Sequence, residues 1–170
     1  MENYNPPPLN IKITSSAFNR VLFSPSINKY KWVEYTPVLW NDTKLVKTNG
    51  TNSGSYVVAH SIYSENMTFV VGANINLQNL TIEIEPLYQI SGTNPKIEVL
   101  LAEPGHYEWI KSSNGTIEKN AIEGGKMENE TIYVCRIENR AGWMTPSKRR
   151  CDSNLLLTYK STYDLLIHKI

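Results

Sequence analysis

The chain has 170 residues, with 17 basic and 16 acidic side chains and a formal net charge of +1. A chain of this length can bury a substantial core, and a net charge so near zero disfavours binding to nucleic acid or to an anionic membrane. Val, Ile, Thr, Tyr, Phe and Trp fill 56 positions against 6 for Ala, which favours strands over helices.

The start of the chain, MENYNPPPLN, has neither the basic residue nor the apolar stretch of a signal peptide, and no apolar run reaches the roughly 18 residues of a membrane span. We therefore expect no membrane insertion, and a protein that is cytoplasmic or released without a leader. Glycosylation acceptors of the form Asn-x-Thr point instead to secretion, if the chain is a mature form. There are six, at Asn41, Asn49, Asn66, Asn79, Asn114 and Asn129.

Strand patterns follow one another along the whole chain. Apolar and polar residues alternate in LNIKI, SYVVAHSIY, LTIEIEP, TIYVCRI and YDLLIHKI, and dipeptides typical of turns separate these segments, among them Asn114-Gly115 and Gly124-Gly125. No window shows a sustained helical stripe. The sequence predicts an all-β fold.

An internal repeat divides the chain. Between Tyr30 and Thr68, an offset of 77 residues held without a gap gives seven identities: Tyr30/Tyr107, Trp32/Trp109, Asn52/Asn129, Tyr56/Tyr133, Val57/Val134, Met67/Met144 and Thr68/Thr145. The apolar runs that close each unit, at 96–101 and 163–170, correspond after a gap of about ten residues. We predict a first repeat over residues 29–104 and a second over 105–170, two tandem antiparallel β repeats packed with pseudo-two-fold symmetry into one compact unit.

Residues 1–28 form an N-terminal extension in this division. Its triple proline should hold the chain extended, and Leu9, Ile11 and Ile13 could then add an edge strand. The two repeats differ in charge, since the first is acidic on balance and the second basic.

Cys135 and Cys151 are the two cysteines of the chain. Two reduced thiols are the simpler expectation, and one disulfide is the alternative. If the two segments pair as a simple hairpin around residues 139–142, Cys135 falls opposite residue 146 or 147, so a bridge to Cys151 would need a β-bulge.

The second repeat resembles the DM-nine repeat, whose pattern runs from a Trp through an Asn-Gly turn, an Ala-x-x-Gly-Gly turn and a Tyr-Val-x-Arg strand to a Thr-Pro-Gly-Lys turn. The residues on this pattern are Trp109, Asn114, Gly115, Ala121, Gly124, Gly125, Tyr133, Val134, Arg136, Thr145, Pro146 and Lys148. The first repeat resembles a degenerate copy. The resemblance implies a tandem pair of β-rich repeats that acts as a mannose-preferring, lectin-like protein in the recognition of microbes, often as a homodimer.

The resemblance also implies a sugar site, in which an Asp three residues after the first Gly of the Gly-Gly turn works with the Lys of the last turn. Lys148 is present, but Met127 stands at the Asp position and Ser147 replaces the Gly. The corresponding residues of the first repeat are Gly50 and Val71, so that site is absent. A carboxylate and an ammonium suit a sugar because its vicinal hydroxyls offer donors and acceptors side by side.

Glu128 and Glu130, beside Met127, are the candidates to replace the missing carboxylate, and Trp143 could offer an apolar face to a sugar ring. Arg136 is a further candidate, with a cross-strand pair to Glu130 or Glu138 as the structural alternative. Lys148 begins a basic triplet with Arg149 and Arg150 that suits a sulfated glycan or a solvated loop. Trp32 and Trp109 are interpreted as core anchors.

No enzyme motif is present: the three histidines lie in unrelated contexts, and there is no nucleophile elbow, phosphate-binding loop or dinucleotide fingerprint. We expect a non-enzymatic protein without metal or cofactor. The alternative to glycan binding is a structural or protein-interaction protein, such as an effector, that keeps the fold without binding sugar. Met127 favours that alternative.

Overall fold

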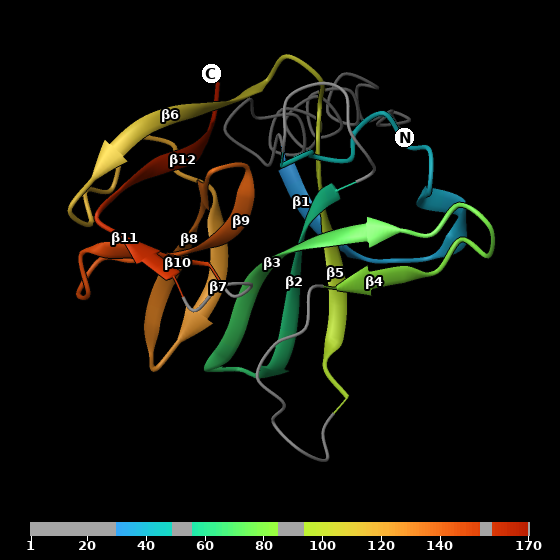
Figure 1. The fold of residues 1–170 in the computed structure, drawn as a ribbon, viewed down its shortest axis with the longest axis horizontal. Coiled ribbons are helices and arrows are strands. Elements are labelled where there is room, and N and C mark those ends of the chain that lie inside the picture. The colour runs from blue at the N-terminus through green and yellow to red at the C-terminus, as the bar shows by residue number, and fades with distance from the viewer. Residues whose placement is uncertain (1–29, 49–55, 85–93, 154–157, 170) are drawn as a thin grey trace, which may run out of the picture.

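The computed structural model describes residues 30–48, 56–84, 94–153 and 158–169, and apart from one short 3-10 turn the regular structure in these residues is β-strand (Figure 1). The predicted extension with its edge strand lies outside the described residues, as do Asn49 and Gly50. Every strand pair in the described part of the chain is antiparallel. The predicted all-β class is confirmed.

The strands follow the chain in two sets. The first set is β1 (Tyr30–Glu34), a 3-10 turn η1 (Pro37–Leu39), β2 (Tyr56–Ser64), β3 (Met67–Ile75), β4 (Ile82–Ile84) and β5 (Lys96–Ala102). The second set is β6 (Tyr107–Ser113), β7 (Glu123–Met127), β8 (Glu130–Ile137), β9 (Arg140–Thr145), β10 (Arg150–Ser153), β11 (Thr158–Lys160) and β12 (Thr162–His168). Figure 1 shows the second set on the left and most of the first on the right.

The same pairing order occurs in both sets. The first set runs β1-β5-β2-β3, and the second runs β6-β12-β8-β9. Backbone hydrogen bonds outside the strands repeat as well. The N–H of Val58 donates to the carbonyl of Val46, and the N–H of Val46 donates to the carbonyl of Leu100. In the second set, Val134 donates to Ile122 and Ile122 donates to Leu166 in the same way.

These bonds correct the gapless offset of 77. Trp32 and Trp109 lie opposite Leu100 and Leu166, so the offset holds there, but Val134 occupies the place of Val58 rather than of Val57. A one-residue shift exchanges the two faces of a strand, so Val57 faces another core. The β2–β3 hairpin is also longer than β8–β9, which removes the equivalence of Met67 with Met144. The two-fold relation between the repeats in space stays a prediction.

Three buried clusters hold the sheet together. One belongs to the first set of strands and one to the second, while the third takes residues from both. The shared cluster is Val46, Val58, Val70, Leu100, Ala102, Ile122, Met127, Ile132, Val134, Ala141 and Leu166. Trp32 and Trp109 are partly buried against it, as expected of core anchors. Each set of strands therefore buries part of its apolar surface against the other.

Gly124 and Gly125 lie where the two halves meet. They sit in strand β7 at a register shift, a β-bulge, so the prediction of a turn at this pair is wrong. A side chain at Gly124 would overlap Val70, and one at Gly125, whose φ is +123°, would press on Thr68. The glycines are needed here because β7 approaches β3 more closely than a Cβ allows.

A buried polar pair crosses the same junction. The His60 Nδ1–H donates to the carbonyl of Gly124 at 2.9 Å, and Nε2 lies 2.8 Å from the Glu98 carboxylate. Trp32 stacks on the His60 ring at 3.8 Å and donates its indole N–H to the Glu123 carbonyl. Burial alone would raise the pKa of Glu98, but the hydrogen bonds from His60 and Lys96 outweigh it and lower that pKa.

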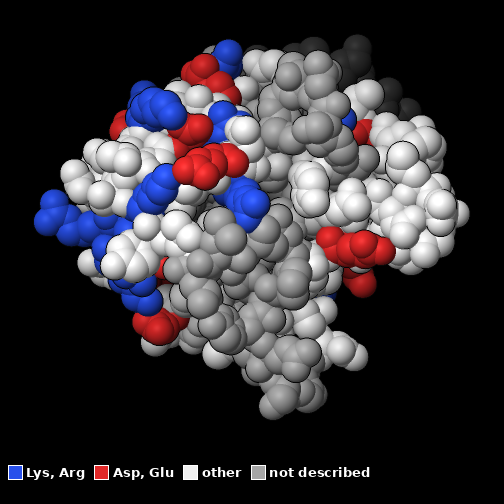
Figure 2. Space-filling model, viewed as in Figure 1, with Lys and Arg blue, Asp and Glu red and all other residues white. Residues whose placement is uncertain are grey.

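The charged side chains are unevenly distributed over the surface. Figure 2 shows most of the visible Lys and Arg residues over the second set of strands, while the face of the first set has few charges. This agrees with the difference in composition between the two halves.

Candidate functional site

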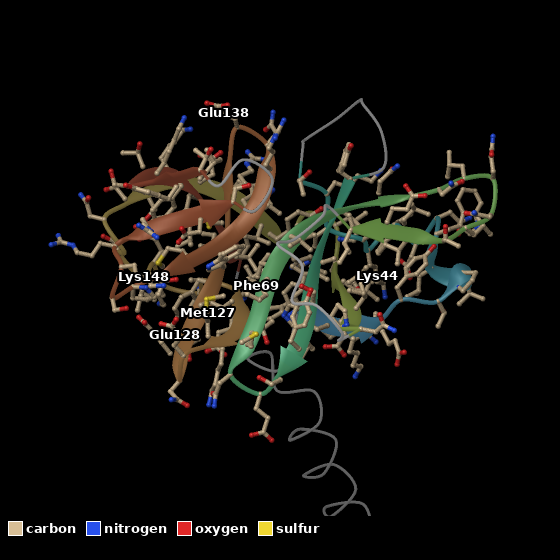
Figure 3. All side chains as sticks on the ribbon, turned by 60° about the horizontal axis from the view of Figure 1, so that its bottom comes forward. Lys44, Phe69, Met127, Glu128, Glu138 and Lys148 are labelled. Atoms are coloured by element: carbon tan, nitrogen blue, oxygen red, sulfur yellow. A yellow bond between two sulfur atoms is a disulfide. The ribbon has the colours of Figure 1, made fainter. Side chains whose placement is uncertain are left out.

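Lys148 lies at the tip of the tight turn between β9 and β10. The N–H groups of Lys148 and Arg149 both donate to the carbonyl of Thr145, and Arg149 adopts a left-handed conformation with a φ of +58°. This backbone reversal leaves the Lys148 side chain exposed (Figure 3).

Glu128 lies on the neighbouring turn, between β7 and β8. Glu128 and Asn129 have φ values of +51° and +65°, which makes this a two-residue hairpin loop of type I′. The N–H of Glu128 donates to the carbonyl of Asn66, so this turn is tied to the β2–β3 turn. The structure brings Glu128 and Lys148 together, with 3.9 Å between the carboxylate oxygen Oε2 and the ammonium nitrogen (Figure 3).

Glu130 holds the turn that carries Lys148. Its carboxylate accepts hydrogen bonds from the N–H of Ser147, at 2.7 Å, and from the hydroxyl of Ser147. The Ser that replaces Gly in the family pattern thus supplies both donors, and Glu130 positions the site.

Met127 faces the shared core, with 9% of its surface exposed. On β7 it lies opposite Met67 of β3 and opposite Glu130 of β8. A carboxylate on this side chain would be largely buried beside apolar groups, which costs free energy unless it is paired. Val71, which the offset of 77 aligned with Lys148, is fully buried on β3, and the strand pairing makes it equivalent to Gly142 instead.

Trp143 packs against the same core. It lies on β9 between Val134 and Asp152, and its ring meets Phe69 edge-on with 5.2 Å between centroids. Phe69 comes from β3 (Figure 3), so its contact with Trp143 joins the two halves of the protein. Core packing therefore accounts for the position of Trp143.

Arg136 is held by three partners. Its Nε–H donates to Asp164 at 2.9 Å, its Nη1–H donates to the carbonyl of Thr48 at 2.7 Å, and its guanidinium lies 4.6 Å from the centre of the Trp109 ring. The expected cross-strand pair with Glu130 or Glu138 is wrong, because β12 lies on the other side of β8 from β9 and supplies Asp164 instead.

The ion pair at Asp164 makes the protein sensitive to acid. Burial alone would raise the pKa of Asp164, but the hydrogen bonds from Lys111 and Arg136 outweigh it and lower that pKa below its ordinary value of 3.8. A carboxyl whose pKa is lower in the folded than in the unfolded state stabilises the fold above its unfolded pKa, and this stabilisation is lost as the pH falls.

We therefore expect the free energy of unfolding to fall below about pH 4. Urea unfolding at a series of pH values measures it. The Asp164→Asn variant should show a smaller loss between neutral and acid pH than the wild type, and an equal loss would contradict this assignment.

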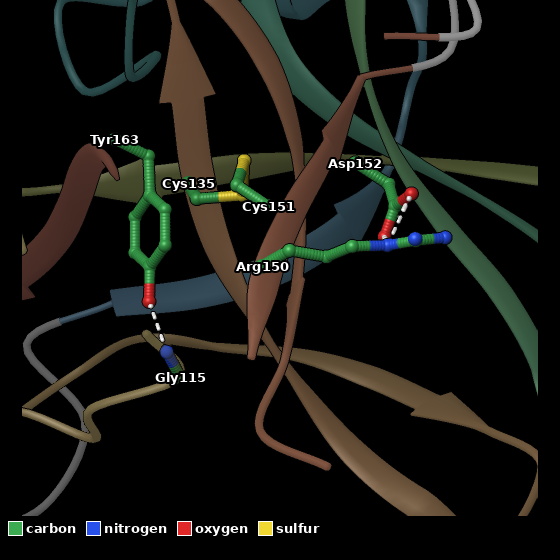
Figure 4. The surroundings of a disulfide bond; sticks show 6 residues. All are labelled: Gly115, Cys135, Arg150, Cys151, Asp152 and Tyr163. Atoms are coloured by element: carbon green, nitrogen blue, oxygen red, sulfur yellow. Dashed lines mark hydrogen bonds and ion pairs between the residues drawn. A yellow bond between two sulfur atoms is a disulfide. The ribbon is translucent and has the colours of Figure 1, made fainter. Parts of the chain in front are cut away.

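A disulfide joins Cys135 on β8 to Cys151 on β10, so the expectation of two reduced thiols is wrong (Figure 4). The two strands flank β9, and strands two apart in a flat sheet lie about 9.5 Å from each other. Here the two Cα atoms are 6.2 Å apart, since β10 folds toward β8. Gly142 permits this, because a side chain there would overlap the carbonyl of Asp152. No bulge is required.

Next to Lys148 the surface is hollowed, with a volume of about 430 Å³. The residues around the hollow are Lys148, Arg149, Arg150, Tyr159, Lys160, Ser161 and Thr162. The sequence marked the basic triplet but missed the residues from β11 and the turn after it. The one feature of the sequence that could have pointed to these residues is the positive charge of Lys160 in a strand-like segment. That charge does not predict the pairing of β11 with β10.

The described part of the chain contains no group of three or more His, Cys, Asp or Glu side chains arranged to hold a metal ion. None of the helical structure in the same residues has the length and apolar character of a transmembrane span.

Comparison with known proteins identifies the second half of the chain. Residues 87–165 match the family model of the DM9 repeat, a recognition-type domain without catalytic activity. A search of curated proteins finds no significant match. The matched region begins before β5 and ends within β12, and it includes Lys148 and Glu128. The resemblance drawn from the sequence is therefore confirmed for this region: residues 87–165 form a DM9 repeat.

Proposed function

We propose that this protein is a non-enzymatic, lectin-like recognition protein that binds glycans of the mannose type through its second repeat. A recognition role is consistent with the DM9 repeat. The observation that carries the proposal is the pair formed by Lys148 and Glu128, an ammonium and a carboxylate exposed on adjacent turns.

The spacing of this pair suits a sugar. At 3.9 Å the two groups are too far apart for a strong hydrogen bond to each other, so both retain capacity for a ligand. A vicinal diol can donate to the carboxylate through one hydroxyl and accept from the ammonium through the next. Glu128 would then supply the carboxylate that Met127 lacks, while Glu130 holds the turn through Ser147.

Maturation in an oxidising compartment is part of this proposal. The disulfide is one supporting feature, since such bonds persist mainly in secreted proteins. The other is that the glycosylation acceptors in the described part of the chain are all exposed: Asn41, Asn66, Asn79, Asn114 and Asn129.

A glycan array followed by mannose titration tests the function. Lys148→Ala and Glu128→Gln should each weaken mannose binding on the order of 10- to 100-fold, because each removes a charge-assisted hydrogen bond to the sugar. Lys31→Ala is the matched control, since Lys31 is an exposed lysine on β1, and it should bind like the wild type. Equal affinity in all four proteins would show that these residues hold no sugar.

The second candidate is a protein-interaction role on the same fold without sugar binding. Met127 supports it, because the position of the family's Asp is taken up by the shared core. Absence of binding to every glycan on the array, by protein shown to be folded, would favour this candidate.

A further inference from the structure

Among the residues that the structure describes, the hollow beside Lys148 is lined by four cationic side chains and by no carboxylate. Lys148, Arg149 and Arg150 come from the β9–β10 turn and the start of β10, and Lys160 ends β11. Three polar groups complete the lining, the hydroxyls of Tyr159, Ser161 and Thr162. A wall with donors and positive charge, and without acceptor anions, suits an anionic ligand.

Three of the four cations have ion-pair partners outside this wall. Lys148 lies 3.9 Å from Glu128, Lys160 lies 2.8 Å from Glu138, and the Nε of Arg150 lies 3.2 Å from Asp152. The hydrogen bond and charge of Lys160 lower the pKa of Glu138.

Arg149 differs from the other three. Its guanidinium donates to the carbonyl of Asn114 at 3.4 Å, and within the described residues it has no carboxylate partner. Its backbone is left-handed, a conformation that favours Gly or Asn. The fold therefore gains little from an arginine here, and apart from the Nε–H bonded to Asn114 the guanidinium is available to a ligand.

Tyr159 adds a surface for a sugar ring. The guanidinium of Arg150 lies 4.0 Å from the centre of its ring and covers one face, yet 59% of the residue is exposed. Pairing of β11 with β10 places Tyr159 opposite Asp152. An exposed aromatic ring packs well against the C–H face of a saccharide.

We propose that this hollow binds an acidic saccharide, with its phosphate, sulfate or carboxylate held by Arg149, Lys148 and Lys160 and its ring against Tyr159. The inference deepens the proposed function, on which it rests, because Lys148 belongs to both the diol-binding pair and the hollow. Neighbouring hydroxyls of the same ligand then reach Glu128.

Isothermal titration with mannose 6-phosphate, mannose and inorganic phosphate tests the inference. Mannose 6-phosphate should bind on the order of 10-fold more tightly than either of the other two, because it alone offers both anion and ring. The advantage over mannose should shrink at high ionic strength, where exposed charges are screened.

Arg149→Gly is the decisive variant. It removes the guanidinium but relieves the left-handed backbone, so the fold should be retained, with an unchanged melting temperature as the check. It should lose most of the preference for mannose 6-phosphate and leave mannose binding unchanged. Lys31→Ala, which changes the net charge equally, should keep the preference, and Glu138→Gln should increase it by freeing Lys160.

The outcomes separate the two proposals. If mannose binds but phosphate adds nothing, the acidic-ligand inference is overturned and the proposed function stands. If mannose fails to bind and mannose 6-phosphate binds through Arg149, the hollow is confirmed and neutral sugar recognition is wrong. Equal affinity for inorganic phosphate, or for a single-stranded oligonucleotide, would overturn the assignment to a saccharide.

Discussion

Replacing Arg136 with alanine is expected to lower the free energy of unfolding by about 3 kcal/mol, because removal of one partner from a buried ion pair leaves the other charge uncompensated. Arg136 and Asp164 are only 16% and 17% exposed. The change also leaves the carbonyl of Thr48 without its donor and removes the cation over Trp109. The expected loss of stability is at the low end for a buried ion pair, because Asp164 still has an ion pair with Lys111 in this variant.

Lys111→Ala is the matched control for this variant. Lys111 contacts the same carboxylate at 2.9 Å, but its side chain is 92% exposed, so its loss should cost less than about 1 kcal/mol. Urea unfolding of the wild type and both variants measures the difference. Similar losses of unfolding free energy in the two variants would show that the contacts of Arg136 with Asp164 and Thr48 contribute no more to stability than an exposed ion pair. The double variant Arg136→Met with Asp164→Leu should recover much of the stability.

Reduction of the disulfide is expected to destabilise the fold by about 3 kcal/mol, since the bond closes a loop of about 16 residues and restricts the unfolded chain. For a chain of this size that corresponds to a fall in melting temperature of about 6–12 °C. Thermal unfolding with and without a reducing agent measures this fall directly. The two cysteines of the chain form this one bond, so the agent has no other disulfide to reduce.

The variant with both Cys135→Ala and Cys151→Ala controls for effects of the reducing agent on the rest of the protein. Its melting temperature should be the same with and without the agent, and close to or below that of the reduced wild type, since the change also removes buried sulfur atoms. A thiol assay on the denatured, unreduced wild type should find no free thiol. Two titrating thiols would contradict the bridge.

The sheet shows how far a repeating pattern can be read from one sequence. Trp32 and Trp109 marked equivalent positions correctly, because large aromatic residues recur where each repeat meets the shared core. The match at Val57 did not carry over because the first set has one residue more between Trp32 and β2, and the match at Met67 did not because the β2–β3 hairpin is longer than β8–β9. Identity at one offset cannot show where a hairpin has lengthened, whereas backbone hydrogen bonds can.

The candidate site was predicted in part. Lys148 and Glu128 were named from the sequence, and the structure brings them together because two tight turns end at the same edge of the sheet. The role of Glu130 in holding Ser147 depends on where its carboxylate points, and spacing along the chain does not determine that. Tyr159 and Lys160 join the site through the pairing of β11 with β10, to which their own segment gives no clue.

The all-β class and the resemblance of the second half to the DM9 repeat could be predicted from the sequence, because alternation, turn residues and a spaced motif are local properties of the chain. Which strands fold over one another depends on how the sheet packs. Gly142 lets β10 approach β8 and join Cys135 to Cys151, and the register of β12 on β8 gives Arg136 its partner Asp164. These contacts depend on backbone distances of a few ångströms between segments far apart in the sequence, which local patterns do not specify.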